Sequence, residues 1–237
     1  MISILLHVFD WSEVWALLIP ISIIFLNPFL DKTLKPVIVY LYVALILNFL
    51  CDFIADFKNV LNFPHWLKTN NYLYNIHSIV RMFFFSIFFI KVNPKSFVVF
   101  KKLILLLFFI FVIINFVLLQ SFFNYKFFSS RLISAETILL LIFCLLYYYK
   151  IMVKDDQNGY YNLPSFWIIT GLCIYIVTSL PIFIFYKALI LENSTFGEYI
   201  WYAHNIAYII FNIFIAIGFN KIKLKNLYKE NDFNSIT

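Results

Sequence analysis

The sequence predicts an all-α integral membrane protein, folded as a bundle of seven transmembrane helices. The first observation behind this prediction is composition: of 237 residues, 63% are hydrophobic and only 13% are charged. Soluble domains are about 45–50% apolar and about 25% charged. The second observation is a recurring apolar run of the length that crosses a bilayer core of ~30 Å as a helix, about 20 residues. The expected partner is therefore the lipid bilayer, and no nucleic acid partner is predicted from the net charge of +6.

The apolar runs are separated by short segments that carry charged, Asn, Gly and Pro residues, as expected of connections between helices. We predict one membrane domain over residues 1–220, followed by a short basic tail over 221–237 that faces the cytoplasm. The predicted spans are residues 12–30, 36–57, 71–91, 101–120, 131–150, 165–187 and 199–220.

Basic residues near the ends of these spans predict their orientation, because cytoplasmic loops collect Lys and Arg. Twelve basic residues fall on the side of the C-terminal tail and five on the other side, which places the N-terminus outside and the C-terminus in the cytoplasm. Aromatic residues typical of the membrane interface agree, since Trp11, Trp66, Tyr125, Tyr199 and Trp201 lie near the predicted outer boundary.

The third span carries a histidine and an arginine within an apolar helix, in the stretch "NYLYNIHSIVRMFFF". With a rise of 1.5 Å per residue, His77 lies ~9 Å and Arg81 ~15 Å from the outer end. Helical periodicity places both on one stripe with Tyr74. A charge near the middle of a bilayer is costly and needs a partner inside the bundle.

Other spans supply polar residues at similar depth, and either Asp52 or Glu136 is expected to neutralise Arg81. We predict a polar cavity that opens to the outside and is closed toward the cytoplasm, where the inner halves of the spans are apolar. The alternative is that these residues form interhelical hydrogen bonds that only pack the bundle. The predicted cavity residues are Asn48, Asp52, Asp56, Tyr74, His77, Arg81, Glu136, Tyr175, Ser179, Trp201, His204 and Asn205.

Three features of the chain resemble a known group of proteins: the overall topology, the stretch "YNIHSIVR" in the third span and the stretch "HNIAYIIFNIFIAIGF" in the seventh. The chain resembles small uncharacterised bacterial seven-helix membrane proteins of the kind found beside, or fused to, sensor kinases. The resemblance implies a sensor in the bacterial cytoplasmic (inner) membrane that signals to a separate cytoplasmic or membrane protein. The predicted cavity would then bind a small polar or lipid-derived ligand. Under that reading, the partner would dock on the loop of residues 150–165 and on the C-terminal tail.

Two other functions remain open from the residues alone, and the sequence leans away from an enzyme. A metal-dependent hydrolase of lipid esters or amides would need a zinc site, for which His77, His204, Glu136 and Asp52 are the candidate ligands. Outside that reading we expect no cofactor. A small proton- or ion-coupled transporter would use the acids within the membrane as part of its path.

Overall fold

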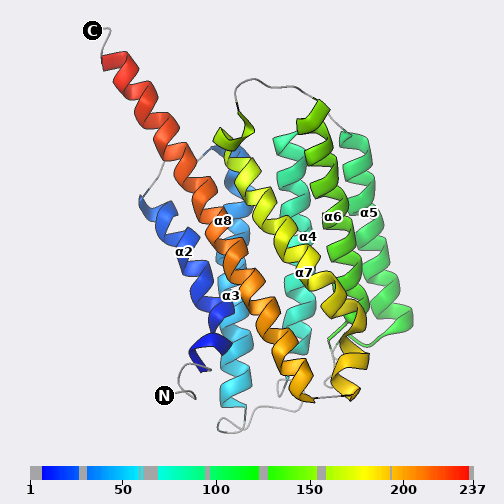
Figure 1. Ribbon diagram of the computed structural model, residues 1–237. Coiled ribbons are helices and arrows are strands. Elements are labelled where there is room, and N and C mark those ends of the chain that lie inside the picture. The colour runs from blue at the N-terminus through cyan, green and yellow to red at the C-terminus, as the bar shows by residue number, and fades with distance from the viewer. Residues whose placement is uncertain are drawn as a thin grey trace.

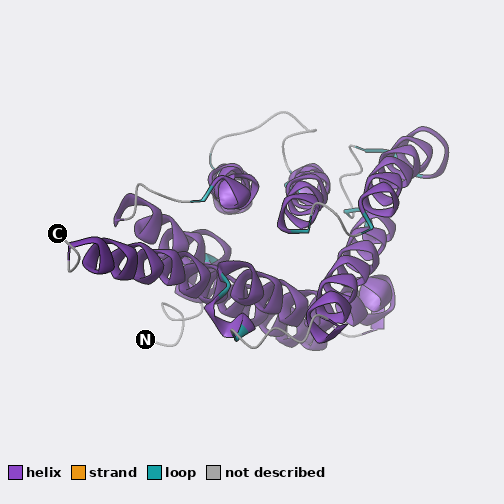
Figure 2. Ribbon diagram, turned by 90° about the horizontal axis from the view of Figure 1, so that it is seen from above, coloured by secondary structure: helices purple, strands orange, loops and turns teal. Residues whose placement is uncertain are grey.

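The computed structural model describes residues 7–26, 31–58, 60, 69–93, 97–122, 128–153, 159–192 and 194–234. Within these ranges the chain forms helices and short connections, and no strand (Figures 1 and 2). Six helical segments are long and apolar enough to cross a membrane, so the chain is an α-helical membrane protein.

The long helices follow one another along the chain with little intervening structure. Short helical turns precede α3 at Lys32–Leu34 and α7 at Tyr160–Asn162, and a π-helical segment, Asn115–Leu119, extends α5. The long helices are α2 (Ser12–Leu26), α3 (Lys35–Phe57), α4 (Asn71–Val92), α5 (Val98–Ile114), α6 (Ser130–Val153), α7 (Pro164–Glu192) and α8 (Ser194–Asn234).

Six of these helices close a ring, in the spatial order α2, α3, α4, α6, α7, α8 and back to α2. The seventh, α5, packs on α4 and α6 and lies at the edge of the bundle (Figure 1). Helices α7 and α8 lie side by side and tilt across the others, and in the view from above α8 runs obliquely toward the C-terminal label (Figures 1 and 2).

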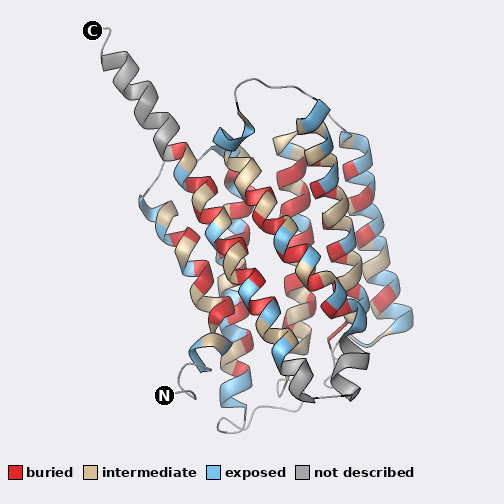
Figure 3. Ribbon diagram, in the orientation of Figure 1, coloured by how far each residue is buried: buried red, intermediate tan, exposed pale blue. Residues whose placement is uncertain are grey.

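Burial differs sharply between α5 and the ring. Only 17% of the most apolar stretch of α5 is buried, against 39–56% in the other five candidate spans. Buried residues line the inward faces of the ring, and exposed positions dominate α5 (Figure 3). Its outer face, with Leu103, Leu106 and Ile110, is therefore suited to lipid.

Close approach of α7 and α8 depends on two glycines. A Cβ atom added at Gly171 would overlap the side chain of Phe214, and one at Gly218 would lie 2.8 Å from the carbonyl oxygen of Pro164. Small residues let helix backbones approach closely where lipid replaces water as the solvent. These two positions thus set the spacing of the helix pair.

The helix bounds lie within a few residues of most of the predicted spans, with differences at three places. Helix α2 ends at Leu26, and residues 27–30 of the first predicted span lie outside the described part. The predicted connection between the last two spans is helical up to Glu192 and again from Ser194. Helix α8 runs through Asn234 and so includes most of the predicted tail, because no Pro or Gly interrupts the chain after Gly218.

Candidate functional site

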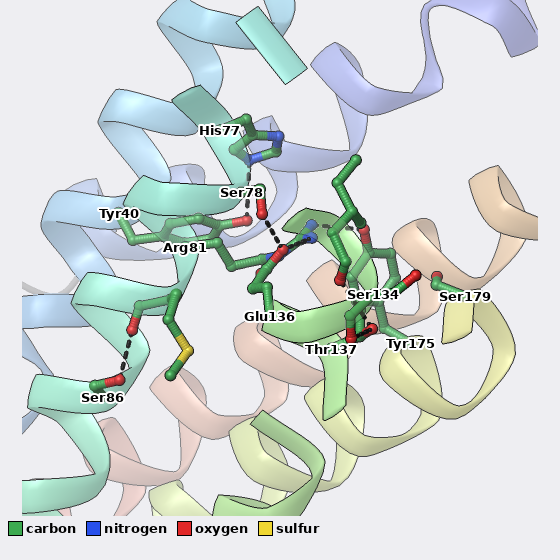
Figure 4. A network of polar contacts seen from close by, with 12 residues as sticks. Tyr40, His77, Ser78, Arg81, Ser86, Ser134, Glu136, Thr137, Tyr175 and Ser179 are labelled. Atoms are coloured by element: carbon green, nitrogen blue, oxygen red, sulfur yellow. Dashed lines mark hydrogen bonds and ion pairs between the residues drawn. The ribbon is translucent and has the colours of Figure 1, made fainter. Parts of the chain in front are cut away.

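A buried ion pair between α4 and α6 organises the polar interior (Figure 4). Arg81 donates from Nε to Oε1 of Glu136 and from Nη2 to Oε2 at 2.8 Å, so the pair is two-pronged. Ser78, one turn earlier on α4, donates to the same Oε2 at 2.6 Å. Arg81 is 4% exposed and Glu136 is fully buried. The expectation that Asp52 or Glu136 neutralises Arg81 is thereby resolved in favour of Glu136.

Helix α7 completes the surroundings of the guanidinium. Arg81 Nη1 donates to the hydroxyl of Tyr175 at 2.6 Å, and its Cζ lies 5.0 Å from the centre of that ring. A planar guanidinium matches a carboxylate with two parallel hydrogen bonds, which makes such pairs specific as well as strong. Three helices of the ring are thus tied together through one side chain.

A small pocket lies beside this pair, near the end of the bundle at which α2, α4, α6 and α8 begin, which we call the pocket end. Its volume is about 20 Å³, enough for about one water molecule. Five helices contribute to its wall. The polar lining residues are Glu13, Tyr74, His77, Ser78, Arg81, Tyr175, Trp201, His204 and Tyr208, and the apolar ones are Ile133 and Phe183.

His204 of α8 stands in an aromatic enclosure at this pocket. Its ring centre is 5.2 Å from those of Trp201 and Phe183 and 5.3 Å from that of Tyr175. Its Nδ1 forms a 3.0 Å hydrogen bond with the hydroxyl of Ser179 on α7. Its Nε2 lies 3.7 Å from Oε1 of Glu13, beyond hydrogen-bond length.

Three further hydrogen bonds join the ring helices around the pocket. The hydroxyl of Tyr40 on α3 lies 3.2 Å from Nε2 of His77, and the two rings stack. Asn48, also on α3, donates to the backbone oxygen of Glu13 at 3.0 Å and to the Tyr208 hydroxyl at 3.2 Å. The junction of α2, α3 and α8 is therefore held by one buried amide.

Most of the residues predicted to line a cavity do meet here. Six of the twelve line the pocket, Glu136 and Ser179 bind residues that line it, and Asn48 contacts two of them. The six are Tyr74, His77, Arg81, Tyr175, Trp201 and His204.

Three predicted residues lie elsewhere. Asp56 is exposed and accepts a 3.0 Å hydrogen bond from Nε1 of Trp11. Asp52, one turn earlier, interacts electrostatically with the carboxyl groups of Glu13, Asp56 and Asp10 and does not line the pocket. Asn205 is fully buried and donates to the backbone oxygen of Phe9 at 3.5 Å. Asp56 of α3 and Asn205 of α8 thus both contact the residues just before α2.

Glu13 is the pocket residue that sequence reasoning missed. It stands in the first turn of α2, where an acid is ordinarily read as a favourable partner of the helix dipole. Yet it is 5% exposed. One feature of the sequence could have identified it: Glu13 is the only acidic residue within the first predicted span, residues 12–30.

The four candidate zinc ligands do not come together. Among the described residues, no three His, Cys, Asp or Glu side chains form a group suited to hold a metal ion. Glu136 has both oxygens engaged by Arg81 and Ser78, and Asp52 does not line the pocket that His77 and His204 share. The geometry of these four residues therefore does not build the site that a zinc ion would need.

Away from the pocket end, the interior is filled by aromatic rings. Phe85 packs edge to face on Tyr40 and lies 5.7 Å from Phe211, and Phe89 packs on Phe143 at 5.4 Å. All of these rings are at most 1% exposed. Beyond Arg81 the buried polar side chains of Ser86 and Asn212 donate to carbonyl oxygens of their own helices, and phenylalanine rings fill the space between the helices.

The site thus combines one buried ion pair, a second buried carboxylate and two histidines in aromatic surroundings. Comparisons of the chain with protein-family models, with curated protein sequences and with solved structures found no match.

Proposed function

We propose that this protein is a membrane-embedded, receptor-like sensor that binds a small polar ligand in the pocket and signals to a separate partner. The observation that carries the proposal is the pocket itself. Charged and hydrogen-bonding groups from α2, α4, α7 and α8 converge on one small space inside an otherwise apolar bundle. A ligand bound there contacts several helices at once and therefore favours one relative placement of them over another.

We also propose a seventh crossing by α2, with the N-terminus outside and the C-terminus in the cytoplasm. Helix α2 has 15 residues, short for a full span, but it packs on both α3 and α8 within the ring. It begins at the pocket end, whereas α8 ends on the opposite side (Figure 1). The excess of basic residues on that opposite side supports the cytoplasmic assignment and a bacterial inner membrane as the location.

Helix α8 supports signalling as the output. It carries His204 and Tyr208 at the pocket and continues without a break to Asn234. Its 41 residues span about 60 Å, roughly twice the bilayer core. A tilt of α8 at the pocket is therefore carried to a surface outside the membrane, where a partner would bind together with the loop of residues 150–165. Residues 154–158 of that loop lie outside the described part.

Transport fits the interior less well. A transported solute needs a route from the pocket to the opposite end, and the fully buried rings of Phe85, Phe211 and Phe143 occupy that space. Opening it would require the core to separate, whereas a sensor needs only a change in helix tilt.

The proposal is tested in two steps with the full chain in nanodiscs. First, small cationic, anionic and neutral solutes are screened for an increase in melting temperature, with Tyr208→Phe as the comparison. This variant keeps the ring and loses the hydroxyl that Asn48 contacts. A solute that stabilises the parent and has a weaker effect on the variant identifies pocket binding.

Second, spin labels at Met152→Cys on α6 and Lys229→Cys on α8, in a chain without its three native cysteines, report the helix distance. The expected result is a change in the distance distribution when the stabilising solute is added. If the distance distribution is unchanged when the solute saturates the pocket, binding does not move the helices, and the sensor proposal is overturned.

A further inference from the structure

Glu13 is a buried carboxylate that the rest of the polar network does not satisfy. It is 5% exposed and lines the pocket, and its Oε1 has no hydrogen-bond partner among the described residues. The nearest titratable nitrogen is Nε2 of His204 at 3.7 Å. A buried acceptor without a donor is unfavourable, and more so when it is charged, so a ligand with a donor gains free energy by binding at this oxygen.

The arginine in the same pocket does not fill this role. Its Nε and Nη2 donate to Glu136, and its Nη1 donates to Tyr175. The positive charge of Arg81 is thereby matched by Glu136. Of the two carboxyl groups at the pocket, Glu13 is the one that no Arg or Lys side chain contacts, so a cation that donates a hydrogen bond fits beside its Oε1.

Neighbouring groups at the junction of α2, α3 and α8 add further acceptors. The side-chain oxygens of Ser12, Asn48 and Asn205 are buried and without a partner in the described part of the chain. Both amides direct their NH₂ groups to backbone oxygens near the start of α2. The carboxyl group of Asp52 lies near enough to interact electrostatically with Glu13. The amide oxygens of Asn48 and Asn205 can only accept a hydrogen bond, whereas the hydroxyl of Ser12 can also donate one.

The remaining wall is aromatic. Trp201, Phe183 and Tyr175 surround His204 at ring-centre distances of 5.2–5.3 Å, and Tyr74 packs edge to face on Trp201. The faces of aromatic rings attract cations, most of all ammonium groups that have lost their water. A carboxyl group that lines the same pocket as these rings is therefore suited to an ammonium ion more than to a strongly hydrated metal cation.

Size narrows the ligand class further. The pocket volume of about 20 Å³ accommodates a species of about the size of one water molecule. Ammonium meets this limit. Methylammonium exceeds it by one methyl group, which would lie beside the partly exposed rings of Tyr74 and Trp201.

We propose that the pocket recognises a small ammonium cation, ammonium itself or methylammonium, through the Glu13 carboxylate and the surrounding rings. This inference rests on the proposed function, because it names the ligand class of the same pocket. The nitrogen donates to Oε1 of Glu13, while its remaining charge lies against the aromatic wall.

The test is calorimetric titration of the full chain in nanodiscs with methylammonium chloride and ammonium chloride, at constant ionic strength and near neutral pH. Potassium chloride and sodium acetate are titrated in parallel. The variants are Glu13→Gln, which removes the charge at nearly constant size, and Asp31→Asn, which removes one negative charge at the opposite end of the bundle. We expect saturable binding of the ammonium salts, ~10–100-fold weaker in Glu13→Gln and unchanged in Asp31→Asn.

Three results would overturn the proposal. Equal binding of potassium would mean that hydrogen-bond donation is not recognised, and unchanged binding in Glu13→Gln would remove the assigned carboxylate. Saturable binding of acetate alone would reject the ligand class while leaving the proposed function intact. Stabilisation by none of the screened solutes would instead reject the proposed function. If Glu13→Gln does not fold, Trp201→Leu, which removes an aromatic face, is measured in its place with the same expected weakening.

Discussion

The guanidinium of Arg81 and the carboxylate of Glu136 form a two-pronged ion pair in the middle of the helix ring, with both side chains nearly inaccessible. Each charge is costly inside an apolar bundle, and each is compensated by the other. The pair is therefore a condition for burying either residue, and it fixes the relative height of α4 and α6.

Replacing Glu136 by Gln should destabilise the protein strongly, because Arg81 is left buried without a counter-charge. The expected loss is about 3–5 kcal/mol, measured by SDS titration of the folded chain. The double variant Arg81→Met/Glu136→Gln should lose less than the sum of the two single variants, since no uncompensated charge remains. Additive losses would show that the two side chains do not act as a pair.

Substitution of Gly218 by Ala should separate α7 from α8, because the added Cβ would lie 2.8 Å from both a backbone oxygen of Pro164 and the side chain of Ile168. We expect a loss of about 1–3 kcal/mol in the same assay. Val177→Ala is the control, because this position of α7 is 54% exposed and lies on the surface of the bundle. A Gly218→Ala variant as stable as Val177→Ala would contradict the close packing.

Single cysteines report the proposed orientation. Tyr199→Cys lies at the pocket end of α8 and Met152→Cys at the opposite end of α6, and both positions are exposed. In intact cells, a membrane-impermeant maleimide should label position 199 directly and position 152 only after permeabilisation. The reverse pattern would invert the orientation, and labelling of both positions from outside would rule out a complete crossing between them.

Breaking α8 beyond the pocket should separate binding from signalling. Proline at position 223 removes a backbone donor and clashes with the preceding turn, at a cost of about 3 kcal/mol to that part of the helix. Lys223→Pro should keep the affinity of the pocket for its ligand and lose the ligand-dependent change between labels at positions 152 and 229. A full distance response in this variant would mean that the signal leaves the bundle by another helix.

The spans and the buried network were predictable to different degrees. Apolar runs locate helices well because each run must satisfy its backbone hydrogen bonds within the membrane. Arg81 and Glu136 were identifiable because a charge amid apolar residues demands a partner. The length of α8 was not predictable from hydropathy, since its last part is charged and continues only because nothing breaks it.

The candidate site was harder to assign at the helix ends. Asp52 and Asp56 share the face of α3 that carries Asn48, but only Asn48 reaches the ring interior, because α2 covers that face and Trp11 binds Asp56. Glu13 was missed since an acid at a helix start is ordinarily solvated. Which of two acids near a membrane boundary turns inward depends on tertiary packing, which periodicity within one helix does not specify.

The peripheral position of α5 has a consequence for chain topology. Helices α4 and α6 are neighbours that both start at the pocket end, so they run parallel, and a parallel pair cannot be joined by a tight turn. Helix α5 is the crossover that returns the chain so that Glu136 enters the ring at the height of Arg81. Its lipid-facing side chains should therefore tolerate wide exchange among apolar residues, whereas its deletion would reverse the direction of α6 and carry Glu136 away from its arginine.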